Sequence, residues 1–468
     1  MSIVAMLSGC CGAFPGHVLS PLARSIPSRA GTSMITVEVI NTGSELLLGQ
    51  VTNTHLGFIA RELFKLGLRV DRQVTVPDGA AIRGAMSEGL ARSSLVIVTG
   101  GLGPTSDDLT RDFAAELLER PLRLNQAVLT KLTDYLGRRG YGVSELTKRQ
   151  AMVPEGGEVL PNDYGTAPGL VMTHRNVGDP PHMPDHVLIL LPGPPRELKP
   201  MWTTYVMPWL RTHLEMQVMH QRTWRVQGVG ESRVQELLEQ ALRELHDFEF
   251  GYCARPGEVD FRLISPDQAA LTRADAVVRG ILADAIYAED EESMEQVVVR
   301  QSVAAGKTIA TAESCTGGLI SNRLTNVPGS SAVLQAGYVT YSNTSKTREL
   351  GVNPALLTTH GAVSEPVARA MAEGARRLAG TSLAVAATGI AGPDGGSAEK
   401  PVGTVWLAVA DETGTHSVRR KLSTDRETFK LMASQVALDL LRLSLKYGAA
   451  RLVDGHGAAP TAAVAGRP

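Results

Sequence analysis

The chain has 468 residues, which is too long for one hydrophobic core and predicts two to four domains. Hydrophobic residues make up 43% and charged residues 20%, as in ordinary soluble globular proteins, and the formal net charge of -2 excludes a general basic field for holding nucleic acid. The four cysteines show no paired metal-ligand spacing, which excludes a disulfide-stapled scaffold and favours a reducing, cytoplasmic compartment.

The two ends of the chain have the composition of disordered segments. Residues 1–33 are rich in Pro, Ser, Gly and Ala, and residues 451–468 have few bulky apolar side chains. The start "MSIVAMLSGCCGAF" lacks a basic leading region, and its apolar run before Cys10 is too short for a signal peptide. Met34 directly precedes a strand-like segment and is a second candidate for the functional start. No apolar run reaches the ~18 residues of a membrane span, so no membrane association is expected.

Residues 34–208 are predicted to form a first, doubly wound domain in which strands alternate with helices. The predicted strands are 35–43, 68–78, 94–101 and 186–191, and the predicted helices are 53–67 and 81–93. Ligands of such sheets bind at the carboxyl ends of the strands, where Glu45, Asp78 and Asp107 are expected. Gly193, Pro194 and Pro195 follow the last strand and predict a stiff, non-helical turn.

Residues 209–290 predict a small α+β domain with no concentration of catalytic residue types. Its pattern is a strand, a glycine turn and a helix over 222–245, two strands over 248–266 and a helix over 267–287. The Gly-Val-Gly-Glu turn at 228–231 suits close approach to a phosphate backbone, but the balanced charge favours a spacer and dimerisation domain. We therefore expect a homodimer that does not bind nucleic acid.

Residues 291–450 predict a third domain, in which a helix over 294–305 and the strand "KTIATAES" lead directly into the helix "GGLISNRLTNV". The intervening Ser-Cys-Thr-Gly-Gly run lies where the unpaired N–H groups of the helix point outward, which suits an anion or an oxyanion. Ser314 is thus either a nucleophile or a plain helix N-cap. Tyr341 and Lys346 are expected at the end of another strand, where the lysine either activates a serine or is an ordinary exposed side chain.

Six motifs occur in one order between Met34 and Arg451, and with them the chain resembles the competence/damage-inducible CinA family. They are "NTGSELLLGQVTNT", "TGGLGPTSDDLTRD", "LPGPPRELKPMW", "AESCTGG", "GYVTYSN" with the following "SK", and "ATGIAGPDGG" with "KPVGTVW". The resemblance implies two three-layer α/β domains with mostly parallel sheets, joined by a small KH-like α+β domain. The first is similar to MoeA/MogA-like molybdopterin-binding domains, and the last resembles the PncC-type nicotinamide-nucleotide amidohydrolases.

This resemblance implies deamidation of nicotinamide mononucleotide by the last domain, as a step of pyridine nucleotide recycling, and metal-dependent cleavage of ADP-ribose by the first. Ser314 matches the family's proposed nucleophile, with Lys346 and Tyr341 as activating partners, and the deamidation needs no metal. The N–H groups from Cys315 to Gly318 are the expected oxyanion donors. Cys315 is the rival nucleophile, because a thiol at a helix N-terminus can have a lowered pKa, but it is equally explained as a small buried residue.

The loops at 99–104 and 388–393 share the order Thr-Gly-x-x-Gly-Pro, yet the first is followed by a helix pattern and the second by a strand pattern, so they are not an internal repeat. Both suit backbone approach to a nucleotide phosphate, although glycine turns after strands are common. The expected substrate-binding residues are Gly43, Gly100, Gly101, Gly103, Gly193, Glu313, Cys315, Thr316, Gly317, Gly318, Thr388, Gly389 and Gly392.

Glu45, Asp107 and Asp108 are the expected ligands of a divalent ion on a pyrophosphate in the first domain, because carboxylate oxygens suit such ions. The alternative role of Asp108 is helix N-capping in "SDDLTRD". Two other function classes stay open: a molybdopterin-related enzyme, because a fold does not fix its ligand, and a nucleotide-binding regulatory protein linked to competence or DNA damage.

Overall fold

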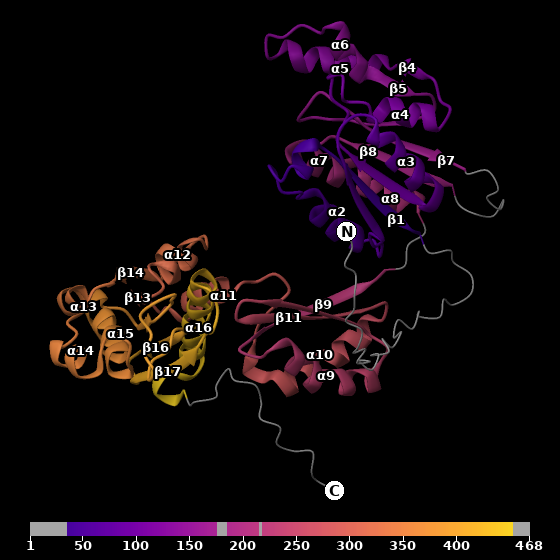
Figure 1. Ribbon diagram of the computed structural model, residues 1–468. Coiled ribbons are helices and arrows are strands. Elements are labelled where there is room, and N and C mark those ends of the chain that lie inside the picture. The colour runs from indigo at the N-terminus through magenta and orange to yellow at the C-terminus, as the bar shows by residue number, and fades with distance from the viewer. Residues whose placement is uncertain (1–34, 176–184, 215–217, 453–468) are drawn as a thin grey trace, which may run out of the picture. The chain divides into compact units, whose positions relative to one another are not determined.

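The computed structural model describes residues 35–175, 185–214 and 218–452 (Figure 1). The chain divides into two compact units that part near residue 215. The first unit is an α/β domain. The second contains a small α+β domain with an antiparallel sheet, followed by a C-terminal α/β domain, as the sequence predicts. The predictions for residues 1–33 and for the tail after residue 452 lie outside the described residues.

The first unit is built on a six-stranded sheet whose central strands are parallel. In sheet order the strands are β2 (Arg72–Val76), β1 (Val37–Thr42), β3 (Leu95–Thr99), β8 (His186–Leu191), β7 (Gly169–His174) and β6 (Glu158–Leu160). The last two pair antiparallel. Every residue of β1, β3 and β8 is buried, as expected of parallel strands that helices cover on both faces.

Eight α-helices and a two-stranded antiparallel sheet complete this unit within its described residues. They are α1 (Ser44–Leu47), α2 (His55–Phe64), α3 (Ala81–Arg92), α4 (Thr110–Leu117), α5 (Gln126–Gly137), α6 (Glu145–Lys148), α7 (Pro195–Met201) and α8 (Met207–His213), with β4 (Leu122–Leu124) and β5 (Met152–Pro154). The expectation that Pro195 belongs to a non-helical turn is wrong, since it is the first residue of α7. Proline is tolerated there because the first helical N–H has no partner within the helix.

The second unit begins with a four-stranded antiparallel sheet. Its strands, in sheet order, are β10 (Glu249–Arg255), β11 (Glu258–Ser265), β9 (His220–Gln227) and β12 (Ile286–Glu289), and its helices are α9 (Glu231–Leu245) and α10 (Gln268–Leu282). The predicted helix to residue 287 is too long: α10 ends at Leu282, and Ala283 has a positive φ of 44°. The chain then enters β12, where Ile286 and Tyr287 suit a strand.

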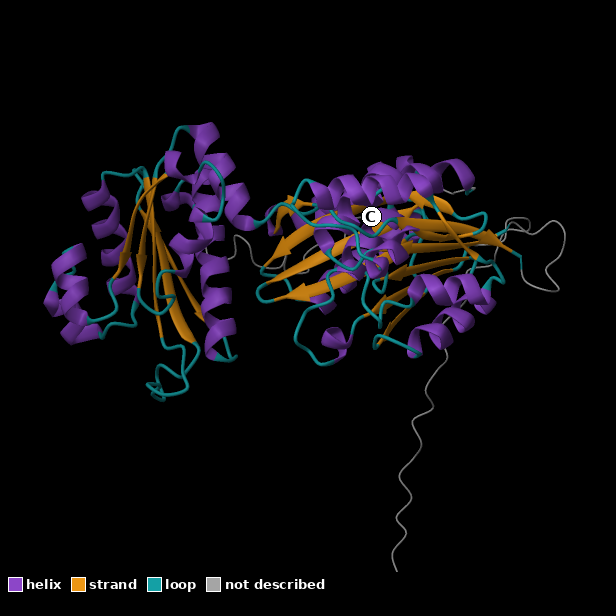
Figure 2. Ribbon diagram, turned by 90° about the horizontal axis from the view of Figure 1, so that it is seen from above, coloured by secondary structure: helices purple, strands orange, loops and turns teal. Residues whose placement is uncertain are grey.

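The C-terminal domain has a five-stranded sheet with helices on both faces (Figure 2). In sheet order its strands are β14 (Leu334–Val339), β13 (Ile309–Glu313), β15 (Leu383–Gly389), β16 (Thr404–Ala410) and β17 (Thr415–Lys421). The first three are parallel, and β16 and β17 add antiparallel pairs. Its helices are α11 (Met294–Ala305), α12 (Leu319–Thr325), α13 (Asn343–Leu350), α14 (Pro354–His360), α15 (Glu365–Ala379) and α16 (Arg426–Tyr447).

Side-chain size differs between the two faces of this sheet. Ala384 and Ala386 of β15 join the core under α15, whereas the alternate residues Leu383 and Val385 join the core under α11 and α16. Successive side chains of a strand point to opposite faces, so the small residues give α15 room for close packing and the large ones fill the space beneath the longer α16. No helix in the described part of the chain is long and apolar enough to cross a membrane.

Candidate active site

Ser314 occupies the sharp connection between β13 and α12. Its backbone N–H donates to the carbonyl of Ala387 on the neighbouring strand β15 at 2.9 Å, which fixes the residue at the carboxyl edge of the sheet. The cap position of α12 is Gly318, which makes no side-chain cap, so Ser314 does not serve as the N-cap that the sequence left open.

Glu313 caps this helix instead. It is fully buried, and its carboxylate accepts hydrogen bonds from the N–H groups of Gly318, Ile320 and Ser321 at 3.0, 3.0 and 2.9 Å. A carboxylate at a helix N-terminus satisfies unpaired N–H donors and complements the helix dipole. The Glu313 carboxylate thus faces the helix, and the Gly318 N–H is engaged with it, while substrate contact at these two residues stays a prediction.

Two backbone N–H groups beside the serine donate to no backbone oxygen in the described part of the chain, although both interact with the Cys315 sulfur. The N–H of Gly317 donates to the Ser314 carbonyl at 3.2 Å, so it too turns inward. Among the described residues, the N–H groups of Cys315 and Thr316 donate to no protein oxygen across a turn or cap. They directly follow the serine, which is the placement that stabilises a negative charge developing on a carbonyl bound at Ser314.

Lys346 lies against the serine. Its Nζ donates to Ser314 Oγ at 3.0 Å and to the carbonyls of Thr340 and Tyr341 at 2.8 and 3.3 Å. The side chain is 1% exposed, and burial lowers the pKa of its ammonium. The interpretation as an ordinary exposed lysine is therefore wrong, and so is its expected position at a strand end, since it lies within α13.

Tyr341 touches the lysine only through its main chain. Its side chain is 65% exposed, and its hydroxyl accepts a hydrogen bond from Arg426 Nη2 at 3.1 Å. The hydroxyl is thus bound at the mouth of the site, whereas the carbonyl helps to hold the ammonium of Lys346. The structure supports a positioning role for this residue rather than direct activation of the serine.

These groups line a cavity of about 190 Å³. Its lining residues are Ser314, Cys315, Tyr341, Lys346, Ala362, Val363, Thr388, Gly389, Ala391 and Arg426. The sequence analysis missed four of these residues, the apolar Ala362, Val363 and Ala391 and the charged Arg426. Arg426 is the first residue of α16, where a cation opposes the helix dipole, and in the described residues no carboxylate forms an ion pair with it. That unfavourable placement was a signal in the sequence that Arg426 serves something other than its helix.

Cys315 is a poor nucleophile in this site. It is 5% exposed, and burial raises the pKa of its thiol to about 12. A thiol reacts through its thiolate, which is scarce at neutral pH when the pKa is raised. The geometry therefore supports the interpretation of Cys315 as a small buried residue.

The glycines of the 388–393 loop are required by packing. A side chain at Gly389 would lie 2.8 Å from the carbonyl oxygen of Thr404, and one at Gly392 would lie 2.6 Å from Val402 Cγ1. The Gly392 carbonyl accepts a hydrogen bond from Arg426 Nη1 at 2.7 Å, and Thr388 Oγ1 donates to the Ala362 carbonyl at 2.9 Å. The loop thus shapes the wall of the cavity and orients the arginine.

Three glycines of the first unit lie at the carboxyl edge of its sheet. Gly43, Gly100 and Gly193 follow the adjacent parallel strands β1, β3 and β8, and the Cα of Gly100 lies 3.6 Å from the position of a side chain at Gly193. A side chain at Gly100 would lie 2.4 Å from Thr42 Oγ1, and one at Gly101 would lie 2.1 Å from Thr110 Oγ1.

Both of these threonine hydroxyls are buried and have no hydrogen-bond partner within the part of the chain that the structure describes. The two hydroxyls fill the space that a side chain at Gly100 or Gly101 would need, so glycine is required at both positions.

The carboxylates of this unit do not form the expected metal site. Within residues 35–175, 185–214 and 218–452, no group of three or more His, Cys, Asp or Glu side chains is placed to hold a metal ion. Asp107 is exposed, and Asp108 accepts hydrogen bonds from the N–H of Thr105, at 2.9 Å, and from its hydroxyl. Glu45 lies in the first turn of α1. Asp108 therefore stabilises the turn that begins at Thr105. It does not cap α4, whose cap residue Leu109 makes no side-chain hydrogen bond to the helix.

A polar cluster beside these loops escaped the sequence analysis. Asn41 Nδ2 donates to Thr99 Oγ1 at 2.8 Å, Asn53 Nδ2 donates to Asn41 Oδ1 at 2.9 Å, and His55 Nδ1 lies 3.4 Å from Thr99 Oγ1. Burial and the nearby ammonium of Lys199 lower the pKa of His55. The only signal in the sequence was the position of Asn41 and Thr99 near the ends of two apolar runs.

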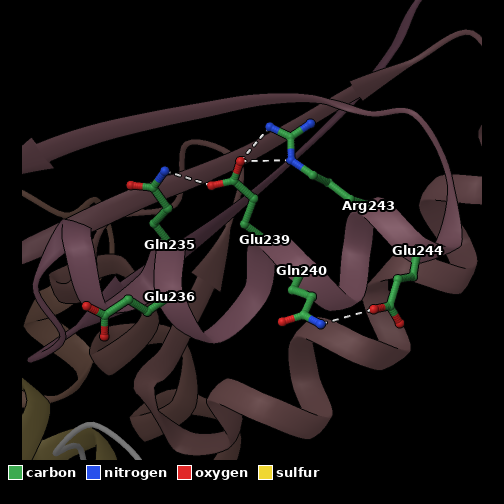
Figure 3. A pocket seen from close by; sticks show the side chains of 6 residues that line it. All are labelled: Gln235, Glu236, Glu239, Gln240, Arg243 and Glu244. Atoms are coloured by element: carbon green, nitrogen blue, oxygen red, sulfur yellow. Dashed lines mark hydrogen bonds and ion pairs between the residues drawn. The ribbon is translucent and has the colours of Figure 1, made fainter. Parts of the chain in front are cut away.

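A wider hollow of about 660 Å³ lies along α9 (Figure 3). It is lined by Gln235, Glu236, Glu239, Gln240, Arg243 and Glu244. These side chains bond along their own helix, with Gln235 Nε2 donating to Glu239 at 2.7 Å and Gln240 Nε2 donating to Glu244 at 3.2 Å. Side chains that bond to one another along one helix face do not make a binding site. The larger hollow therefore lacks the reactive side chains that line the smaller cavity at Ser314.

Family models match three successive parts of the chain. Residues 38–212 match the "Probable molybdopterin binding domain", residues 221–288 the "Damage-inducible protein CinA KH domain", and residues 291–445 the "CinA C-terminal domain".

Whole proteins match as well. A "CinA-like protein" of Akkermansia muciniphila is 47% identical over 405 residues, which cover 86% of this chain and 96% of that protein. A second, of Gemmatimonas aurantiaca, is 40% identical over 418 residues, covering 87% and 95%. The crystal structure of "competence/damage inducible protein CihA" from Agrobacterium tumefaciens shares 43% identity over 33% of this chain and 93% of that one, with a TM-score of 0.31.

Proposed function

The chain belongs to the CinA family, and we propose that its C-terminal domain hydrolyses the carboxamide of nicotinamide mononucleotide to nicotinate mononucleotide and ammonia. The observation that carries the proposal is the pair formed by Ser314 Oγ and Lys346 Nζ at 3.0 Å inside the cavity. A buried amine whose pKa is lowered can be neutral and can take the serine proton, as amide-hydrolysing nucleophiles require.

The first half of the reaction follows from this geometry. Neutral Lys346 takes the hydroxyl proton as Ser314 Oγ bonds to the carboxamide carbon, and the negative charge on the carbonyl oxygen falls to the N–H groups of Cys315 and Thr316. Lys346 then returns the proton to the leaving nitrogen. The carbon–nitrogen bond breaks, ammonia leaves, and a nicotinoyl ester remains on the serine.

Water completes the cycle by the reverse proton path. Lys346 takes a proton from the water as its oxygen bonds to the ester carbon, and it gives that proton to Ser314 Oγ as the ester bond breaks. The product acid ionises to nicotinate. Each turnover therefore consumes one water and restores both side chains.

Arg426 supports a substrate that carries a negative charge. Its guanidinium lies on the cavity wall, without an ion-paired carboxylate among the described residues, and it is held by the Gly392 carbonyl and the Tyr341 hydroxyl. Arginine suits phosphate through its planar set of donors. The exposed Tyr341 ring is next to it and offers a surface on which a pyridine ring can stack.

The test uses the purified full chain with nicotinamide mononucleotide, following ammonia and nicotinate mononucleotide together. Equal amounts of both products are expected, and the Ser314→Ala variant is the matched control. Nicotinamide riboside tests whether the phosphate matters. If the wild-type chain releases no ammonia from the nucleotide, the proposal is wrong, and a binding or regulatory role becomes the better account.

A second activity, cleavage of ADP-ribose by the first unit, is supported by one observation. Gly43, Gly100 and Gly193 follow the adjacent parallel strands β1, β3 and β8, at the edge where such sheets bind nucleotides. The three expected metal ligands do not converge there, so the metal requirement stays a prediction. Release of AMP from ADP-ribose, assayed with and without a divalent cation, tests it.

A further inference from the structure

A partly buried network of hydrogen bonds joins the small antiparallel sheet to the helices of the C-terminal domain. Gln435 of α16 donates from Nε2 to Glu258 Oε2 of β11 at 2.9 Å, and its Oε1 accepts from Arg323 Nη2 of α12 at 2.6 Å. Arg323 also donates to Ser434 Oγ at 2.9 Å and pairs with Glu295 at 2.7 Å. Gln435 is 3% exposed, so water does not compete for these bonds.

At one end of this hydrogen-bond network, the Glu258 carboxylate is itself held by several partners. Its carboxylate accepts from the hydroxyl of Tyr287 and pairs with Arg225 at 3.3 Å. Arg225 also pairs with Asp260 at 3.2 Å and is 5% exposed. A carboxylate with several charged and polar partners cannot move freely, so it is a fixed anchor for Gln435.

The other end of this hydrogen-bond network reaches the two helices that border the cavity. Arg323 lies in α12, the helix that follows the Ser314 turn and whose N-terminus is tied to Glu313. Gln435 lies in α16, the helix that begins with Arg426. The same glutamine side chain therefore links the helix behind the serine to the helix that carries the arginine.

We propose that Gln435 is a positioning residue, through which the small sheet fixes the spacing between Ser314 and Arg426. This rests on the proposed amidohydrolase function. A substrate held at both ends needs that spacing to be correct, because small displacements of a bound group from its reactive geometry lower the rate strongly. A purely apolar contact between the helices would bury the same area but would tolerate sliding, whereas a partly buried hydrogen-bond network specifies one arrangement.

The test replaces Gln435 with methionine in the full chain, which keeps the length of the side chain and removes both bonds. The expected result is a loss of about 2- to 30-fold in kcat/KM for nicotinamide mononucleotide, the range that coupled networks show. The loss should be smaller for nicotinamide riboside, because it has no phosphate for Arg426 to hold. The matched control is Gln240→Met on the exposed face of α9, where the same change should leave both substrates unaffected.

A second variant guards against a folding defect. Gln435→Glu still accepts from Arg323 but places a carboxylate against Glu258, so it should lose activity in the same way, and the double variant Glu258→Gln with Gln435→Glu should regain it because an amide again faces a carboxylate. Thermal unfolding of each variant is measured alongside.

The outcomes separate the two proposals. Turnover by folded Gln435→Met equal to that of the wild type overturns the positioning role alone. Equal losses for the nucleotide and the riboside, or no recovery in the double variant, also overturn it. A wild-type chain that releases no ammonia overturns the amidohydrolase function itself.

Discussion

Replacing Lys346 with methionine removes the proposed general base while keeping a side chain of similar length in a buried place. The wild-type Nζ is 3.0 Å from Ser314 Oγ, and nothing else among the described residues is shown bonded to that hydroxyl. Without the amine, the serine proton has no acceptor inside the cavity. We expect deamidation to fall by about 10² to 10⁴-fold, the usual contribution of a positioned base.

The stability change should be small by comparison. Methionine cannot donate to the carbonyls of Thr340 and Tyr341, and each lost hydrogen bond costs about 1 kcal/mol. Against this, the variant no longer buries an ammonium, whose desolvation lowers the pKa of Lys346. The two effects have opposite sign, so we expect a net change within about 2 kcal/mol.

The sign of the pH dependence follows from the lowered pKa. The unfolded chain binds the lysine proton more tightly than the folded chain, so the buried ammonium costs stability in full below the folded pKa, and this cost declines as pH rises from the folded pKa to the unfolded value of ~10.4. Activity needs the neutral amine, so kcat/KM of the wild type should rise with pH through the same pKa, which lies below the ~10.4 of an ordinary lysine.

The assay is kcat/KM for nicotinamide mononucleotide across the pH range, with thermal unfolding of wild type and Lys346→Met at each pH. The variant should gain stability relative to the wild type as pH falls from ~10.4 to the folded pKa of Lys346, and the difference should stay constant below it. A variant that retains wild-type turnover, or a wild-type profile without a rising limb below the ordinary lysine range, would refute the assignment of Lys346 as the base.

Four further outcomes follow from the same structure. Ser314→Ala should lower deamidation by about 10² to 10⁴-fold or more with the fold intact, whereas Cys315→Ala should be mild, since the thiol is protonated; a collapse of activity in the cysteine variant would reverse the two roles. Arg426→Met should raise KM for the nucleotide and leave nicotinamide riboside unchanged, and equal effects on both would remove the phosphate contact. The fragment 291–450 carries its own sheet and should fold and deamidate, with kcat/KM reduced as in the glutamine variant; full activity would argue against coupling to the small sheet. Asp107→Ala should abolish metal-dependent ADP-ribose cleavage if the carboxylate binds the ion, and unchanged cleavage would leave that exposed side chain without a role in it.

The parts of the fold that the sequence predicts best are those with continuous apolar runs. β3 and β15 are buried along almost their whole length, and a strand covered on both faces must be apolar at every position, so the pattern leaves little choice. The end of α10 was harder to predict, because Ala283 has good helix propensity and yet adopts a positive φ of 44°.

The proposed catalytic pair could be predicted only in part, because local sequence pattern and tertiary contact carry different information. The placement of Ser314 follows from a strand that turns directly into a helix, which is local. Its distance to Lys346 depends on the burial of α13 against the sheet, and the contribution of Arg426 comes from a helix far along the chain. Glu313 is adjacent to the serine, yet its capping of the helix could not be predicted, because a sequence does not show whether a carboxylate faces the cavity or the helix.

The two loops with the order Thr-Gly-x-x-Gly-Pro show how the same letters meet different physical needs. At Gly389 and Gly392 an added side chain would strike a backbone oxygen and a valine, so glycine is needed there for packing, and the loop serves the cavity by holding Arg426. At Gly100 and Gly101 it would strike two threonine hydroxyls that have no partner among the described residues. Glycine is therefore needed for close packing at both loops. What distinguishes the second loop is its place in the wall of the cavity of about 190 Å³ and its hydrogen bond to Arg426.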